Sequence, residues 1–337
     1  MNKSNLMRLF VFVTVVTAAI VFFVTRDRTS YMTAEGVIWT TEYHITYECD
    51  RNLADSINTV FNRIDNSANV YNKLSLVSQF NDNGAVKADS ILAILLIEAQ
   101  MVNKQSDGLY DPTVMPLVNA WKKAQKEGRT PSHGYIDSLV KLVGLEKVTI
   151  AADSMRASRP GVQLDFSSIA KGLACDEIGR MLDRNGVKNF LVEIGGEVVA
   201  QGVNSRGTNW CVSVDMPTDQ PDATSHQSAL TLTLANEAVA TSGNYRKFAI
   251  VDGKRVNHII NPKTGFTSQS DLLSVTVVAQ HCVTADAWAT ACMAMGTAAT
   301  QQLMQSRSDL AVMTISTDSL GHYIIWSNPA FAQKLPQ

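Results

Sequence analysis

The chain has 337 residues, a formal net charge of −2, and hydrophobic residues at 45% of its positions. That length suffices for one large domain or two closely joined halves. The nearly balanced charge gives no indication of nucleic-acid binding, and the five cysteines show no metal-ligand spacing. Their odd number means that they cannot all pair. We therefore expect mostly buried thiols, with one disulfide left open if the domain is extracytoplasmic.

An apolar run from Leu9 to Val24 follows two basic residues at the N-terminus and is typical of a signal peptide or a membrane anchor. A cleavable signal peptide has a shorter apolar region and a small-x-small site after it, and this segment has no such site. We therefore expect an uncleaved anchor within residues 1–30 and one catalytic domain, residues 31–337, outside the cytoplasm. No cysteine precedes Cys49, which excludes a lipid-modified cysteine at the end of the run.

Periodicity in the rest of the chain predicts an α+β fold in which helices and strands alternate irregularly. The predicted strands are Glu42–Glu48, Phe190–Glu193, Trp210–Val214, Ala229–Leu234, Phe248–Val251 and Leu273–Ala279. The predicted helices are Leu53–Asn69, Ser90–Asp107, Val114–Ala124, Ser132–Val143, Ile169–Asn185, Thr284–Ala294 and Thr297–Gln305. The polar segment Pro217–His226 is expected to form an exposed hairpin loop, and Gly195-Gly196 a tight turn.

The start of the helix predicted from Ile169 collects groups that suit a phosphorylated ligand. Asp165, Ser167 and Ser168 lie at the helix entrance, and Lys171 lies in the first turn. Unpaired backbone N–H groups and the positive end of the helix dipole favour phosphate there, and a lysine adds a full charge. An ordinary N-cap with a solvated lysine explains the same residues equally well.

Asp286 and Thr290 in the predicted helix Thr284–Ala294 lie four residues apart and therefore share one helix face. A carboxylate and a hydroxyl suit a hard cation such as Mg²⁺, which keeps water or substrate phosphate in the rest of its shell. A helix-start Asp and a Thr bonded to a carbonyl are common without any metal. His258, in an apolar run before the turn Pro262-Lys263-Thr264-Gly265, is a candidate general base or a packed histidine.

Five sequence blocks in order resemble the ApbE family, the FAD:protein FMN transferases. They are Trp39–Tyr47, Tyr71–Asn81, Asp107–Trp121, Asp165–Glu197 and Ala238–Gly296, which span nearly everything after residue 38. Each block alone is a weak motif, but the ordered set is specific. The resemblance implies a T-fold-like mixed domain with antiparallel sheets and packed helices.

The resemblance also implies roles for individual residues. Seven positions match those that contact FAD in the family: Tyr71, Leu109, Tyr110, Asp111, Asp165, Lys171 and Ile260. A backbone oxygen at Ser168 and the side chains of Asp286 and Thr290 match the magnesium ligands. His258 matches the histidine proposed to deprotonate the acceptor hydroxyl.

One block departs from the family pattern. Where the family has Met-Gly-Thr, this chain has Trp39-Thr40-Thr41. An indole at position 39 can cover an isoalloxazine ring by stacking. Without the glycine, the backbone has less room to approach the ligand closely. We include Trp39 among the residues expected to bind FAD.

The implied chemistry is phosphoryl transfer, in which a Thr or Ser hydroxyl of an acceptor protein attacks the FMN-side phosphorus of FAD and AMP is released. FAD is then a substrate and Mg²⁺ the cofactor. The acceptors that the resemblance implies are subunits of membrane ion-pumping electron-transfer complexes, which suits an enzyme on the periplasmic side of a bacterial inner membrane. Two alternatives remain open from the sequence: a hydrolase that splits FAD with water, and a flavin-binding protein without turnover.

Overall fold

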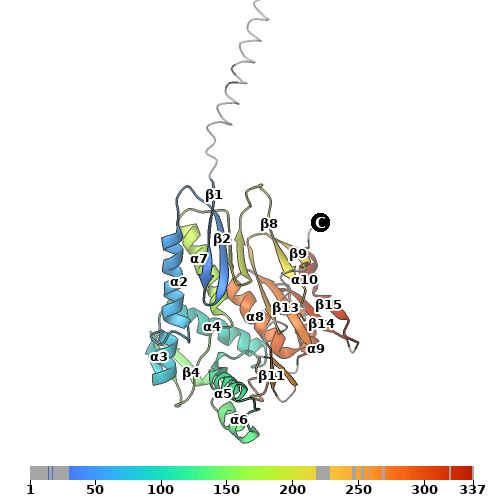
Figure 1. Ribbon diagram of the computed structural model, residues 1–337. Helices are drawn as coiled ribbons and strands as arrows, with labels where there is room; N and C mark the ends of the chain where they lie inside the picture. Colours follow the sequence, from blue (N-terminus) through green and yellow to red (C-terminus); the bar gives the residue numbers. More distant parts are fainter. Residues whose placement is uncertain are drawn as a thin grey trace, which may run out of the picture.

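The computed structural model describes residues 30–217, 228–244, 248–251, 254–257, 259–267, 270–318 and 320–335, together with Thr14 and Thr17. Its centre is an antiparallel sheet with the strand order β1-β2-β6-β7-β10-β13-β14-β15 (Figure 1). These strands are β1 (Tyr31–Ile38), β2 (Thr41–Glu48), β6 (Phe190–Ile194), β7 (Glu197–Gln201), β10 (Glu237–Gly243), β13 (Leu272–Ala279), β14 (Ala311–Thr317) and β15 (Tyr323–Ser327).

Residue alternation along the central strands gives the sheet two buried faces. Ala238 and Ala240 of β10 belong to the larger apolar core, while Val239 between them belongs to the core on the opposite face. Successive side chains of a strand point to opposite sides, so both faces of the sheet must be covered.

Helices cover one face of the sheet (Figure 1). α7 packs on β6 and β7, α8 packs on β10 and β13, and α2 and α4 pack in turn on α7 and α8. These helices are α2 (Ala54–Ala68), α4 (Ser90–Gln105), α7 (Ala170–Arg184) and α8 (Cys282–Met295). α8 is buried almost all round and includes the fully buried Trp288, as expected of a helix that is apolar on every side.

The opposite face of the sheet is covered by a two-stranded ribbon and a short helix. The ribbon consists of β8 (Trp210–Asp215) and β9 (Ser228–Leu234), and α10 (Pro329–Ala332) lies beside it. Trp210, Leu232 and Phe331 join the apolar core on this face.

The remaining elements surround the lower end of the molecule in Figure 1. α5 and α6 share a third apolar cluster with Ile260. The elements are α3 (Leu76–Asn83), β3 (Ala85–Lys87), α5 (Met115–Lys126), α6 (His133–Val140), β4 (Val148–Ala151), β5 (Ser154–Ala157), β11 (Phe248–Val251), β12 (Lys254–Asn257), α9 (Thr297–Met304), and 3-10 turns at Pro112–Val114 and Leu145–Lys147.

The predicted α+β class is confirmed, and each predicted helix is present with ends within three residues of those expected. Each predicted strand is present within one residue, and Gly195-Gly196 is the tight turn between β6 and β7, with φ of 61° and 100°. The sequence analysis missed α3, α10 and the strands β1, β3, β4, β5, β7, β10, β12, β14 and β15.

Several predictions fall outside the described residues. They concern most of the expected anchor at residues 1–30, most of the expected loop Pro217–His226, and His258. In the part of the chain that the structure describes, no helix combines the length and the apolar character that a membrane crossing requires. All five cysteines are free thiols; Cys211 is exposed and the other four are buried, as expected for most of them.

Candidate active site

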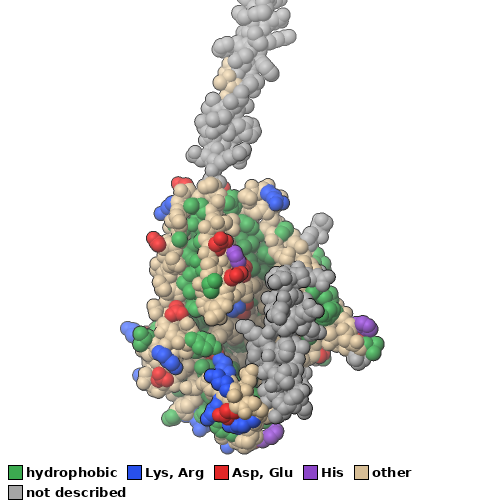
Figure 2. All heavy atoms as spheres, viewed as in Figure 1, with side chains coloured by type: hydrophobic (Ala, Val, Ile, Leu, Met, Phe, Trp, Pro, Cys, Tyr) green, Lys and Arg blue, Asp and Glu red, His purple; other side chains and the backbone are tan. Residues whose placement is uncertain are grey.

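A cavity of about 1020 Å³ lies between the end of the β1–β2 hairpin, the first turn of α7, one face of α8 and the segment that precedes α5. Figure 2 shows the hollowed face of the molecule, with lysine and arginine side chains gathered below the hollow where Figure 1 has α5 and α6. The structure brings together on the cavity wall all of the described residues that we expected to bind FAD or metal: Trp39, Tyr71, Leu109, Tyr110, Asp111, Asp165, Ser168, Lys171, Ile260, Asp286 and Thr290.

α7 and α8 meet at backbone contact where they enter the cavity wall. The N–H of Gly172 donates a hydrogen bond of 3.1 Å to Oδ2 of Asp286. A Cβ at position 172 would lie 2.6 Å from the carbonyl oxygen of Cys282 and 2.9 Å from Cβ of Asp286. Glycine is therefore required here because the neighbouring helix occupies the space of a side chain.

Three ionisable side chains form a buried charge cluster, which we define as Lys171, Glu197 and Asp286. Lys171 forms an ion pair with Glu197, and the two carboxylate residues are only 3% and 4% exposed. A carboxylate that follows a turn is usually solvated, but Glu197 is buried. Its position directly after the Gly195-Gly196 turn points the carboxylate inward from β7 toward Lys171.

The charge cluster carries more negative than positive charge when all three groups are ionised. Burial raises the pKa of Asp286 well above its usual range, and the neighbouring Glu197 raises it further against the opposing effect of Lys171. Burial also raises the pKa of Glu197, although Lys171 opposes this. For Lys171, burial lowers the pKa but the carboxylates of Glu197 and Asp286 outweigh it, so that the lysine stays charged.

The approach to α7 differs from an ordinary N-cap. The N-cap residue is Ile169, with no side-chain hydrogen bond to the helix start. Asp165 instead accepts a 2.9 Å hydrogen bond from the N–H of Ser167 and so holds the preceding turn. The hydroxyls of Ser168 and Tyr110 lie 3.1 Å apart, and burial raises the pKa of Tyr110 well above its usual range. The phenol therefore stays neutral and able to donate a hydrogen bond.

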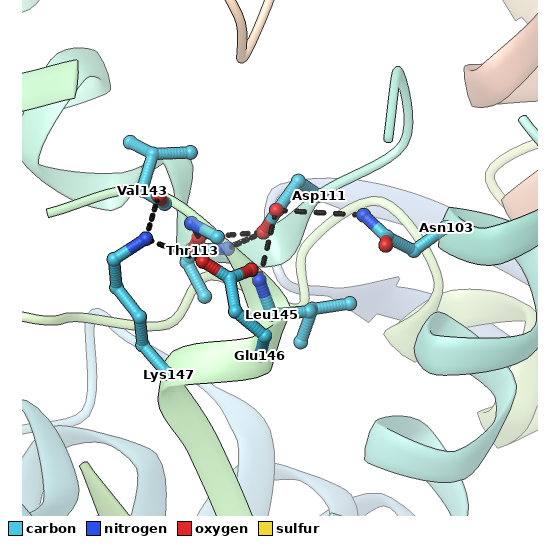
Figure 3. A network of polar contacts seen from close by, with 8 residues as sticks. Asn103, Asp111, Thr113, Val143, Leu145, Glu146 and Lys147 are labelled. Carbon is cyan, nitrogen blue, oxygen red and sulfur yellow. Dashed lines mark hydrogen bonds and ion pairs between the residues drawn. The ribbon is translucent and has the colours of Figure 1, made fainter. Parts of the chain in front are cut away.

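Asp111 is occupied by hydrogen bonds inside the cavity wall (Figure 3). One carboxylate oxygen accepts from the N–H and the hydroxyl of Thr113 at 2.8 and 2.6 Å, and the other accepts from the N–H of Leu145 at 3.1 Å and from Asn103 at 3.4 Å. The residue is 8% exposed, and burial raises its pKa against these bonds. Its side chain thus fixes the shape of the segment that carries Leu109 and Tyr110.

Comparison with known proteins decides the family. The model of the ApbE family matches residues 39–314. The chain belongs to the ApbE family. It is 30% identical over 288 residues to the FAD:protein FMN transferase of Escherichia coli K12, covering 83% of this chain and 80% of that protein. It is also 30% identical over 328 residues to the Haemophilus influenzae protein of the same name, covering 91% and 92%.

Solved structures of ApbE proteins have the same fold. The flavin transferase ApbE of Vibrio cholerae matches with a TM-score of 0.80 at 28% identity, over 91% of this chain and 99% of that one. The Thermotoga maritima ApbE protein matches with a TM-score of 0.79 at 25% identity, over 91% and 100%. The mixed fold with antiparallel sheets and packed helices is therefore that of the ApbE family.

The departure from the ApbE pattern lies at the tip of the β1–β2 hairpin. Trp39 and Thr40 have positive backbone φ angles of 48° and 65°, which residues other than glycine rarely adopt. Trp39 is held by a 3.0 Å hydrogen bond from its indole N–H to Asp65 and by an edge contact with Phe61 at 5.7 Å between ring centroids. These contacts fix the indole on the cavity wall in spite of the strained backbone.

Tyr71 lies at the cavity mouth and is 72% exposed. Its hydroxyl accepts a 3.0 Å hydrogen bond from Lys122, whose Nζ lies 5.2 Å from the ring centroid. Lys122 therefore gives the mouth a positive charge beside an aromatic face. The sequence analysis did not select Lys122, because a lysine on the outside of a predicted helix is usually only solvated.

The donors near Asp286 fit the metal that the family resemblance implies. Asp286, Thr290 and Ser168 offer only oxygen atoms, which Mg²⁺ prefers, and the hydroxyls of Thr290 and Ser242 lie 3.4 Å apart beside them. Within the described ranges, no group of three or more His, Cys, Asp or Glu side chains is placed to hold a metal. A bound cation would offset the surplus negative charge of the ionised charge cluster, and Mg²⁺ typically takes its other ligands from water and substrate phosphate. The residues therefore fit Mg²⁺ together with a phosphorylated substrate.

Proposed function

We propose that this chain transfers FMN from FAD to a Thr or Ser hydroxyl of an acceptor protein, in a Mg²⁺-dependent reaction that releases AMP. That the chain is an FAD:protein FMN transferase follows from its membership of the ApbE family and from its curated relatives. The observation that carries the finer proposal is the cavity, where aromatic side chains and the buried charge cluster share one wall.

The cavity can hold the two halves of FAD in different surroundings. Its volume of about 1020 Å³ lies at the upper end of the range for small-molecule sites. Trp39, Tyr71 and Ile260 supply aromatic and apolar surface for an isoalloxazine ring. Lys171 and the start of α7 supply positive charge and helix-end N–H groups for the pyrophosphate.

The proposed step is a single displacement at phosphorus. The acceptor oxygen forms a bond to the FMN-side phosphorus, the bond from that phosphorus to the bridging oxygen breaks, and AMP leaves with the bridging oxygen. Mg²⁺, when bound, would supply charge neutralisation at the pyrophosphate. Lys171 holds a full positive charge at the cavity wall because the carboxylates beside it raise its pKa. We assign the acceptor proton to His258 from the family resemblance.

If His258 is the base, transfer activity should rise with pH through an imidazole-like pKa, because only the neutral ring accepts a proton. The measurement is the initial rate of acceptor labelling from pH 5 to 8 at saturating FAD and Mg²⁺. A flat profile over this range would remove His258 from the mechanism while leaving the binding residues in place.

The place and the partner of the reaction are part of the proposal. The apolar N-terminal run is proposed to anchor the chain in a bacterial inner membrane with the catalytic domain in the periplasm. The proposed acceptors are flavoprotein subunits of membrane ion-pumping electron-transfer complexes, which an enzyme anchored beside them can reach.

The function is tested by incubating the full-length chain with FAD, Mg²⁺ and a candidate acceptor subunit, followed by in-gel flavin fluorescence and analysis of released nucleotides. We expect fluorescence on the acceptor that requires Mg²⁺ and disappears in Asp286→Ala, while FAD binding weakens only in part. Free FMN and AMP with an unlabelled acceptor would indicate hydrolysis instead. Unchanged FAD would indicate a binding protein without turnover.

A further inference from the structure

The N-terminus of α8 is capped from another helix. The N-cap residue of α8 is His281, which makes no side-chain hydrogen bond to the helix start. Instead, Asp176 of α7 accepts hydrogen bonds from the N–H of Cys282 at 2.9 Å and from the N–H of Val283 at 3.0 Å, one on each carboxylate oxygen. Asp176 is 6% exposed. A buried carboxylate bonded to two N–H groups at the positive end of a helix is a strong and well-oriented contact.

A second contact lies one helical turn away. Gly172 and Asp176 are four residues apart on α7, and Cys282 and Asp286 are four residues apart on α8. At one level the side chain of Asp176 binds the backbone of α8, and at the other the backbone of Gly172 binds the side chain of Asp286. Sliding or separation of the two helices would break these hydrogen bonds. The helices are also in close contact, because a Cβ at position 172 would meet the backbone of α8.

The joint between the helices sets the spacing of the proposed metal donors. Ser168 lies just before α7 and Lys171 lies in its first turn, whereas Asp286 and Thr290 lie on α8. Asp176 does not line the cavity, and its carboxylate binds the backbone of α8 at Cys282 and Val283. We infer that Asp176 is a positioning residue, which fixes α8 against α7 so that Asp286 and Thr290 are held at the spacing that Mg²⁺ and the FAD pyrophosphate require.

This inference rests on the proposed function, since it concerns the affinity of the same site for Mg²⁺. Removing a group that orients metal ligands typically lowers metal affinity by 10–100-fold. Asp176→Asn keeps the size of the side chain and one acceptor oxygen, but it loses the second acceptor and the charge. We expect the Mg²⁺ concentration for half-saturation to rise by about 10-fold or more, with kcat largely recovered at high Mg²⁺ and KM for FAD little changed.

The test is a Mg²⁺ titration of the full-length chain at fixed FAD, read by thermal unfolding as well as by transfer activity. The matched control is Asp89→Asn, which alters another helix-capping carboxylate: Asp89 caps α4 through a 2.9 Å hydrogen bond from the N–H of Leu92. The control should lower Tm without changing the Mg²⁺ concentration for half-saturation. A lowered Tm with an unchanged Mg²⁺ response in Asp176→Asn would reduce Asp176 to a structural residue and overturn the inference.

Two further outcomes separate this inference from the proposed function. If the wild-type chain shows no response to Mg²⁺ at all, the Mg²⁺ part of the proposed function fails and this inference fails with it. If Asp176→Asn does not fold, hydrogen exchange on the wild type decides the question. Mg²⁺ with FAD should slow amide exchange at Cys282 and Val283 but not at Leu92, and equal exchange with and without them would contradict the positioning role.

Discussion

Replacing Asp286 by Asn should make the metal-free chain more stable at the same time as it destroys the proposed metal site. The Asn side chain has nearly the same shape and keeps an oxygen to accept the 3.1 Å hydrogen bond from Gly172. It removes a carboxylate that is buried beside a second carboxylate, Glu197, with only Lys171 to compensate both. Without metal, this carboxylate opposes folding at neutral pH.

The sign of the effect follows from the direction of the pKa shift. The folded-state pKa of Asp286 lies well above the usual range, so the folded chain binds the proton more tightly than the unfolded chain. The free energy of unfolding therefore falls as pH rises above the ordinary Asp pKa of about 3.9. Asn does not titrate, so the variant lacks this contribution to the fall of the free energy of unfolding with pH. The stability gain from Asp286→Asn should be small near pH 4.5 and should grow toward pH 8.

The size of the gain is set by the partial compensation from Lys171. Leaving a buried polar or charged group inadequately paired costs on the order of 1–3 kcal/mol, and the lost attraction to Lys171 offsets part of this. A net gain of about 1 kcal/mol corresponds to a Tm rise of about 2–4 °C for a domain of this class. We expect a rise of this order at pH 8 with EDTA present.

The assay is thermal unfolding of wild type and Asp286→Asn from pH 4.5 to 8, first with EDTA and then with Mg²⁺ and FAD. Adding Mg²⁺ and FAD should make the wild type the more stable of the two, because only the wild type keeps the carboxylate that is proposed to bind the cation. Asp183→Asn is the control, since this α7 carboxylate is exposed and its pKa is lowered by Lys188, so its replacement should not raise Tm. A variant that is less stable than the wild type at every pH in EDTA would refute the account of the charge cluster.

Two further predictions concern backbone geometry. Gly172→Ala should lower the free energy of unfolding by about 1–3 kcal/mol or more in denaturant titrations, because its Cβ would lie 2.6 Å from a carbonyl oxygen of α8. The control is Gly134→Ala in α6, where the added Cβ meets nothing within 4 Å and should not destabilise the chain. Equal losses of stability in the two variants would contradict the close contact between α7 and α8. Thr40→Gly should raise the free energy of unfolding by about 0.5–1 kcal/mol by releasing a φ of 65°, whereas Thr46→Gly within β2 should lower it. A loss of stability in both threonine variants would show that the Thr40 side chain stabilises the hairpin tip more than its backbone strain costs.

The helices that were predicted could be found because their apolar periodicity and end signals are local, whereas the short helices α3 and α10 were missed. α8 shows the limit of this reasoning. It begins at Cys282, two residues before the predicted start at Thr284, and its capping carboxylate comes from Asp176, far away in the sequence. No local pattern contains that information. The strand β10 (Glu237–Gly243) was missed because Ala, Ser and Gly have weak strand propensity, and its burial between two layers decides its conformation instead.

The residues of the candidate site could be predicted where they belong to one of the five sequence blocks that resemble the family. The family resemblance selected residues from five separate blocks, and the described ones among them line one cavity. Glu197 could not be assigned, because a carboxylate after a turn is usually solvated and only the fold turns it toward Lys171. Asp111 was selected by position, yet its carboxylate is taken up by Thr113, Leu145 and Asn103. The spacing of residues in a motif does not show whether a side chain holds the cavity wall in shape or contacts the ligand.

The central claim is the transfer of FMN from FAD to a protein hydroxyl, and the most direct measurement is the intact mass of the acceptor together with the AMP released. The account predicts that the wild-type chain with FAD and Mg²⁺ adds one FMN per acceptor through a phosphoester, with one AMP formed for each FMN attached. An acceptor of unchanged mass while FAD is converted into free FMN and AMP would contradict the claim, and so would acceptor labelling that proceeds equally well with Asp286→Ala or without Mg²⁺.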